Sequence, residues 1–229
     1  MEITWLGHGT FQIVLPGGET LILDPWTTGN PSYPAGFEIT RCDTILISHG
    51  HFDHIQDALP LASKFGSTVV AIYETAAWLG RKGVANCAGM NKGGTQRVGS
   101  VDVTMTHAIH SCGIAEDDGS FVYGGEAAGY VLTFPDGRVA YFAGDTTVFS
   151  DMALIAELYK PDLAFLPIGD LYTMGPREAA LACRLLKAPM VIPMHFGTFP
   201  PLVGRPSKLQ ELAPDTKIWE LSPGVTVTW

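Results

Sequence analysis

Short apolar stretches rich in β-branched residues alternate along this chain with turn residues, and the pattern predicts many strands. The expected strands cover residues 3–6, 11–15, 20–23, 44–48, 68–72, 101–106, 129–134, 138–142, 163–167 and 191–194. Apolar positions at helical spacing predict helices over about 56–65, 74–81, 149–159 and 176–186. The segment from Lys217 to Trp229 is expected to add one or two final strands.

Three segments lack a clear period. Residues 26–42 are rich in Gly, Pro and Ser and are expected to form a long loop, which is often functional. Residues 83–100 are Gly-rich with weak strand signals, and residues 113–126 are expected to be a Gly- and acid-rich loop. In contrast, Pro135-Asp136-Gly137 lies between two expected strands and indicates a hairpin.

Strands and helices are mixed along the chain, and both its start and its middle carry antiparallel hairpins. This order favours an α+β fold with two mixed sheets flanked by helices over one parallel sheet. No charge block, low-complexity tract or linker divides the chain, so residues 1–229 are expected to form a single domain. No dinucleotide-binding glycine fingerprint follows the first strand.

Composition narrows the classes of function. A chain of 229 residues with 46% hydrophobic and 16% charged residues can bury a sizeable core. The net charge of −9 argues against a nucleic-acid partner and leaves a small-molecule substrate. No apolar run approaches the roughly 20 residues that span a bilayer, so no membrane association is expected. Four scattered cysteines and an N-terminus without a signal-peptide pattern predict a cytoplasmic protein with reduced thiols.

The most informative motif is His49-Gly50-His51-Phe52-Asp53-His54, which follows the apolar run 44–48. Ordinary core packing does not require three imidazoles and a carboxylate within six positions. Imidazole nitrogens and carboxylate oxygens are ligands for zinc, iron and manganese. The motif therefore predicts a metal site at the end of this strand.

Further His and Asp residues follow other expected strands. Asp145 comes after 138–142 and His195 after 191–194, while His107 and His110 both follow 101–106. Functional groups are commonly placed at such strand ends, where rigid backbone meets adaptable loops. Of the two histidines after 101–106, His110 is preferred because His107 lies nearer the strand. Seven candidate ligands are too many for one tetrahedral ion and suit two ions that share a carboxylate. They are His49, His51, Asp53, His54, His110, Asp145 and His195.

Other short motifs extend over most of the chain: Trp5-Leu6-Gly7-His8-Gly9-Thr10, Leu23-Asp24-Pro25, His110-Ser111, Gly144-Asp145-Thr146 and Met194-His195-Phe196-Gly197-Thr198. With His-x-His-x-Asp-His, they give a chain that resembles the metallo-β-lactamase-fold hydrolases, whose fold is a four-layer αβ/βα sandwich. More narrowly, it resembles a small bacterial branch near ascorbate-6-phosphate lactonase and N-acylphosphatidylethanolamine phospholipase D.

The resemblance implies a role for each ligand. His49, His51 and His110 would hold one ion, Asp53, His54 and His195 the other, and Asp145 would bridge them. A hydroxide between the ions would be the nucleophile, and Asp53 would orient it and later donate a proton to the leaving group. The ions are expected to be Zn²⁺, with Mn²⁺ or Fe²⁺ as alternatives. His51 stands where the flavin-linked di-iron oxygen reductases of this superfamily usually carry Glu, which favours a hydrolase.

The resemblance favours cleavage of a lactone or another carboxylic ester or amide of a small metabolite. The alternatives are a phosphodiesterase and, in a different class, a non-catalytic metal-binding or ligand-sensing protein. Compact members of this branch often associate, so a homo-oligomer is possible.

Four further residues are candidates for supporting roles. His8, Tyr172 and Arg177 are candidate substrate contacts, and Asp24 is a candidate partner for the free N–H of a ligand histidine. The competing interpretations are a turn hydrogen bond for His8, a helix-face position for Arg177 and a strand-end Asp before proline for Asp24.

Overall fold

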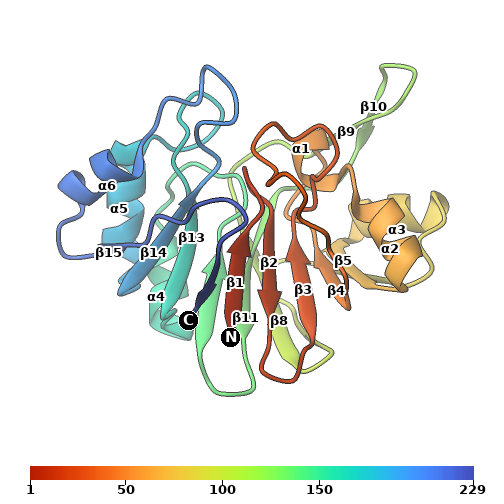
Figure 1. The fold of residues 1–229 in the computed structure, drawn as a ribbon, viewed down its shortest axis with the longest axis horizontal. Helices are drawn as coiled ribbons and strands as arrows, with labels where there is room; N and C mark the ends of the chain where they lie inside the picture. Colours follow the sequence, from red (N-terminus) through yellow and green to blue (C-terminus); the bar gives the residue numbers. More distant parts are fainter.

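Two seven-stranded sheets lie face to face in the computed structural model, which describes residues 1–229 (Figure 1). The strands of the first sheet are Glu2–Trp5 (β1), Phe11–Val14 (β2), Thr20–Leu23 (β3), Thr44–Leu46 (β4), Thr68–Ile72 (β5), Cys87–Met90 (β6) and Thr226–Thr228 (β16). They are ordered β16-β1-β2-β3-β4-β5-β6. The strands β16 to β3 pair antiparallel, and β3 to β6 pair parallel.

The second sheet repeats this division. Its strands are Thr95–Val98 (β7), Val101–His107 (β8), Ala128–Thr133 (β11), Val139–Phe142 (β12), Leu163–Pro167 (β13), Met190–Met194 (β14) and Lys217–Ile218 (β15). They are ordered β15-β14-β13-β12-β11-β8-β7, parallel from β15 to β12 and antiparallel from β12 to β7. The strand β13 is buried along its whole length, as expected where helices cover the outer face of a parallel sheet.

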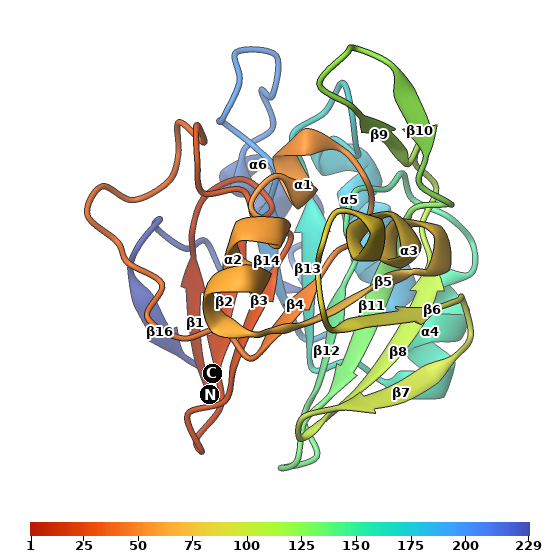
Figure 2. The ribbon, with the colours of Figure 1, turned by 90° about the vertical axis from the view of Figure 1, so that its right-hand side faces the viewer.

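Helices cover the outer faces of both sheets. They are Phe52–Ile55 (α1), Ala58–Phe65 (α2), Tyr73–Arg81 (α3), Met152–Tyr159 (α4), Pro176–Leu186 (α5) and Pro206–Leu212 (α6). One apolar cluster joins α2 and α3 to the first sheet, and another joins α4, α5 and α6 to the second (Figure 2). The result is the expected α+β fold, a four-layer αβ/βα sandwich. None of these helices has the length and apolar character that crossing a membrane requires.

The largest buried cluster, of 26 residues, lies between the two sheets. At its centre the ring of Phe11 from the first sheet packs edge-on against Phe165 of the second, with centroids 4.8 Å apart. Such an aromatic pair is worth about 0.5–1.5 kcal/mol beyond the area it buries. Near one end of the sandwich, the hydroxyl of Tyr130 donates to the carbonyl of Ile47 at 2.7 Å and ties the second sheet to the end of β4.

Strand direction decides where polar residues gather. The strands β12, β13 and β14 are parallel, and β8 runs the same way because both β8 and β12 are antiparallel to β11. Their carboxyl ends therefore meet at one edge, where the long loops gather at the top of Figure 1. In α/β sheets this is the edge at which ligands bind.

The loop prediction for residues 113–126 was wrong, and the weak strand signals over residues 83–100 correspond to two strands. Residues 83–100 contain β6 and β7, and residues 113–126 contain a separate hairpin, Gly113–Ala115 (β9) and Phe121–Tyr123 (β10). The strands β6 and β7 are sheet edges with few buried side chains, so they lack the apolar pattern that marks a central strand. The β9–β10 hairpin projects from the body beside the loop edge (Figure 2), so it also carries little core pattern.

Helix boundaries also differ from the prediction. A single turn, α1, precedes the helix expected over about 56–65, which is α2; α4 begins only at Met152, and α6 was not expected. The short α6 begins with Pro206 in its first turn, where a proline costs no hydrogen bond. The expected helices over 74–81 and 176–186 are present as α3 and α5.

Candidate metal centre

Four strands deliver the polar residues of the site to the loop edge. His49 follows β4, His110 follows β8, Asp145 follows β12 and His195 follows β14. The short helix α1 adds Asp53 and His54 in its single turn, and His51 precedes it in extended conformation. Seven residues from four separate parts of the chain thus converge at the loop edge.

The side-chain oxygen Oδ2 of Asp145 lies at the centre of the group. Four ring nitrogens surround it, at 3.0 Å (His195 Nε2), 3.4 Å (His54 Nε2), 3.7 Å (His110 Nε2) and 3.9 Å (His49 Nε2). A carboxylate in this position could coordinate two bound ions.

The remaining donors form two sets. His49, His51 and His110 place one nitrogen each within 4.8 Å of one another, and Nε2 of His49 lies 3.0 Å from Nδ1 of His51. Asp53, His54 and His195 do the same, together with His8. In that set Oδ2 of Asp53 is 3.8 Å from Nε2 of both His54 and His195. A third group, Asp24, His49 and His54, joins one imidazole from each set.

Hydrogen bonds hold the Nδ1 atoms of two imidazoles, those of His49 and His54. Nδ1 of His54 lies 2.7 Å from Oδ2 of Asp24, so Nε2 faces the site. Asp24 also accepts hydrogen bonds from the backbone N–H and the hydroxyl of Ser48, and that hydroxyl lies 2.9 Å from Nδ1 of His49. Such partners set the tautomer and the orientation of metal ligands. Ser48 was not predicted, although its position directly before His49 was a signal for it.

The residues fit bound divalent cations. Nε2 of His54 and Oδ1 of Asp145 are buried without any hydrogen-bond partner, which is rare unless a ligand satisfies the atoms. Burial lowers the pKa of His49, His51 and His110, so these imidazoles are neutral at pH 7, as metal ligation requires. Burial opposes ionisation of Asp145, but His195 and His54 outweigh it and hold the pKa of the carboxyl well below its usual range.

His54 behaves differently from the other imidazoles. Burial alone would lower its pKa, but the nearby carboxylates of Asp145, Asp53 and Asp24 outweigh burial and raise the pKa well above 6.5. Without cations, His54 therefore carries the proton that balances these acids. Replacing that proton with a divalent cation keeps the buried charges compensated.

His8 lies behind Asp53 and is fully buried. Its Nε2 is 2.9 Å from Oδ2 of Asp53, and burial together with His195 lowers the pKa of His8 to about 4. A neutral His8 therefore donates its Nε2–H to the carboxylate. Its backbone carbonyl accepts hydrogen bonds from the N–H of His195 at 3.1 Å and from the indole of Trp5 at 2.9 Å. The structure thus places His8 in the support of Asp53 and not on the surface open to a substrate.

A cavity of about 650 Å³ opens above the donors. Asp53, Asp145, His51, His110 and His195 all line it, so a molecule in the cavity reaches both donor sets. A volume of this size is typical of small-molecule sites.

Of the other residues considered for the site, Tyr172 lines this cavity, and Arg177 and His107 lie outside it. Arg177 is exposed in the first turn of α5 and is not part of the lining. His107 is also exposed, with its Nδ1 2.9 Å from the ammonium of Lys92, so His110 is the histidine after β8 that joins the site.

Comparison with known proteins agrees with the fold. The family described as Beta-lactamase superfamily domain matches residues 19–196, a range that holds all seven candidate ligands. The chain therefore belongs to the metallo-β-lactamase superfamily.

Similar proteins give a narrower placement. A UPF0173 metal-dependent hydrolase of Solibacter usitatus is 68% identical over 231 residues, which cover 100% of both chains. Another, of Koribacter versatilis, is 54% identical, and the alignment covers 99% of this chain and 97% of the Koribacter protein. The solved structure of Igni18, a metallo hydrolase from Ignicoccus hospitalis, has a TM-score of 0.88 at 34% identity and covers 100% of this chain and 97% of its own. Within the superfamily, the chain is thus a metal-dependent hydrolase.

Proposed function

We propose that this protein holds two divalent cations and hydrolyses a lactone or another carboxylic ester or amide of a small molecule. The observation that carries the proposal is the arrangement of two three-residue donor sets around the carboxylate of Asp145, on the floor of an open cavity. His49, His51 and His110 would hold one cation, Asp53, His54 and His195 the other, and Asp145 would contact both. A neutral imidazole and carboxylate set suits Zn²⁺ best, with Mn²⁺ or Fe²⁺ as alternatives.

Two cations in these sets would lower the pKa of a shared water to about 7 and polarise the scissile carbonyl. The protein supplies orientation and proton transfer. Asp53 faces the cavity and is hydrogen-bonded to His8. Burial would raise the pKa of its carboxyl, but His54 and His8 outweigh burial and keep this pKa low. Asp53 is therefore ionised at neutral pH, and in the proposed mechanism its carboxylate orients the attacking water and transfers a proton from it to the leaving oxygen or nitrogen.

The test begins with metal-free protein that is reloaded with Zn²⁺, Mn²⁺ or Fe²⁺ and measured for bound metal. Each form is assayed on a panel of lactones, carboxylic esters and amides, and on bis-p-nitrophenyl phosphate. We expect turnover of the carboxylic substrates only in the loaded forms. Turnover of the phosphodiester alone would reverse the assignment, and no turnover of any compound by protein with two bound ions would favour a ligand-sensing role.

A further inference from the structure

The walls of the cavity differ from its floor. Apart from the donors and Ser111, the side chains that line it are apolar or aromatic, and none is Lys or Arg. The large ones are Phe52, Phe121, Tyr172, Phe199, Pro200 and Pro201. The floor can act on a polar bond, while the walls offer mostly apolar surface to the rest of a bound molecule.

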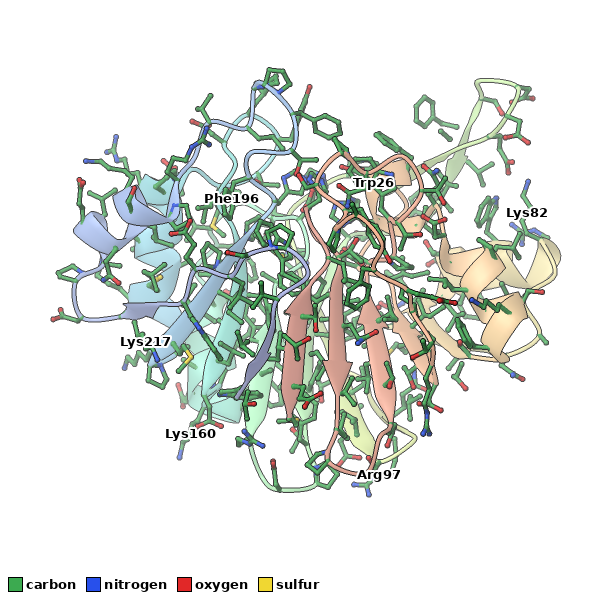
Figure 3. The ribbon with its side chains drawn as sticks, viewed as in Figure 1. Trp26, Lys82, Arg97, Lys160, Phe196 and Lys217 are labelled. Atoms are coloured by element: carbon green, nitrogen blue, oxygen red, sulfur yellow. The ribbon has the colours of Figure 1, made fainter.

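One wall is held rigidly. The ring of Trp26 is buried, with 3% of its surface exposed, and it packs edge-on against Phe52 with centroids 5.6 Å apart. It also stacks on Phe199 at 5.7 Å. In Figure 3, Trp26 lies among the loops at the edge where the strands end. Phe52 and Phe199 come from segments almost 150 residues apart, and this shared anchor fixes both of them before a ligand binds.

Two further aromatic side chains of the lining are exposed to solvent. Phe121 of the β9–β10 hairpin is 75% exposed and Tyr172 is 57% exposed, and both line the cavity. Exposed large apolar groups that gather around one concave surface mark a binding site more often than scattered ones do. Covering these rings with an apolar ligand would remove them from water.

Cationic side chains are engaged elsewhere. Lys82 pairs with Glu116, Arg97 pairs with Asp102, and Figure 3 shows Lys82, Arg97, Lys160 and Lys217 at the periphery, away from Trp26. Arg205 donates to the backbone carbonyls of Leu202 and Gly204. A negatively charged substrate group away from the scissile bond would therefore meet no Lys or Arg in this cavity.

We propose that the substrate is an uncharged ester, lactone or amide that carries an apolar alkyl or aryl group, seated against Phe52, Phe121, Tyr172 and Phe199. This inference rests on the proposed hydrolase function. In each turnover one water adds across the acyl C–O or C–N bond, which gives a carboxylic acid and an alcohol or amine, or a hydroxy acid from a lactone. Phosphorylated sugars are poor candidates because the walls do not compensate their charge.

The first test compares lactones of equal ring size on the Zn²⁺-loaded protein: γ-butyrolactone, its analogue with a four-carbon alkyl tail, and an analogue whose tail ends in a carboxylate. We expect kcat/KM to rise at least roughly tenfold with the alkyl tail, since each buried methylene contributes several-fold. The carboxylate end should remove this gain. Phe121→Ala should reduce it, while Tyr123→Ala, which changes an exposed aromatic on the same strand outside the cavity lining, should not.

The second test measures binding without turnover. Acetohydroxamate, octanohydroxamate and a hydroxamate of similar length that ends in a carboxylate are titrated calorimetrically into the loaded protein and its Phe121→Ala and Tyr123→Ala variants. We expect octanohydroxamate to bind at least roughly tenfold more tightly than acetohydroxamate, and Phe121→Ala to diminish the difference. If no lactone, ester or amide is hydrolysed but this tail dependence holds, the proposed function fails and only the apolar binding site remains. If lactones are hydrolysed but the tail has no effect, or the charged tail is preferred, the inference is overturned.

Discussion

Oδ2 of Asp24 lies 2.7 Å from Nδ1 of His54, and both side chains are completely buried. The contact involves Nδ1 of the imidazole and leaves Nε2 toward Asp145 and Asp53, so Asp24 fixes the orientation of the His54 ring. Through Ser48, the same carboxylate also reaches the far nitrogen of His49. One acid thus supports an imidazole in each of the two donor sets.

The first prediction concerns this support. Asp24→Asn should lower the affinity for the bound cation by about 10- to 100-fold, because the ring of His54 loses its charged partner. Competition against a chelating dye measures the affinity. Asp43→Asn is the matched control, since Asp43 accepts a backbone N–H near the start of β3, away from the site. Equal affinities in the two variants would contradict the role of Asp24.

His8 should act through Asp53. Removing the Nε2–H donor in His8→Ala should lower kcat at least roughly tenfold with little change in KM, because His8 does not line the cavity. His8 has a φ of 55°, a left-handed conformation that Asn tolerates better than most residues. His8→Asn should therefore fold well, and its side-chain amide can replace part of the lost hydrogen bond. A change in KM with an unchanged kcat would instead indicate that His8 contacts the substrate.

Asp53 is predicted to be indispensable for turnover but not for folding. Asp53→Ala should lower kcat/KM by about 10²- to 10⁴-fold through loss of proton transfer, and the number of tightly held cations should fall. Thermal unfolding and circular dichroism check that the fold is retained. Asp151→Ala, which removes an exposed carboxyl before α4, is the control. Unchanged turnover in Asp53→Ala would be incompatible with the proposed mechanism.

The sequence indicates the central strands of the fold more clearly than its edges. The strands β13 and β14 are almost continuously buried, so their apolar runs mark them without knowledge of their partners. The strand β6 is Cys87-Ala88-Gly89-Met90, half-buried, and exists because it pairs with β5. The strand β5, about 20 residues earlier in the chain, stabilises it by pairing. The residue pattern within β6 alone does not reveal this partner.

The candidate site divides in the same way. The donor residues could be predicted because imidazole and carboxylate chemistry is distinctive and each group directly follows a strand. The position of His8 behind Asp53 could not, since it depends on how the turn after β1 meets α1 and the end of β14. The apolar walls also escaped prediction: Phe52, Phe121 and Phe199 are ordinary aromatic residues until the fold brings them around one cavity.

Cation binding should depend on pH in one donor set more than in the other. The pKa of His54 is raised, so the metal-free protein holds a proton there that a cation must displace. Affinity at the Asp53, His54 and His195 set should therefore rise with pH from 6.5 upward, by up to roughly tenfold per unit for one released proton, until pH passes the pKa of His54. The His49, His51 and His110 set has lowered pKa values and should change little in that range. Calorimetry in buffers of different ionisation enthalpy counts the protons, and binding at pH 7 without proton release would contradict this assignment.

Gly169 should be essential for the position of His195. A Cβ atom built on Gly169 would lie 2.0 Å from the backbone oxygen of His195, and this contact cannot relax by rotating a side chain. Gly169→Ala should therefore shift the end of β14, destabilise the fold by about 1–3 kcal/mol and weaken cation binding. Gly17→Ala is the control, because nothing lies within 4 Å of its added Cβ and its φ is not in the left-handed region. Denaturant unfolding of both variants, with and without Zn²⁺, gives the two effects. A Gly169→Ala protein as stable as Gly17→Ala would show that this close approach of two backbones does not hold His195 in place.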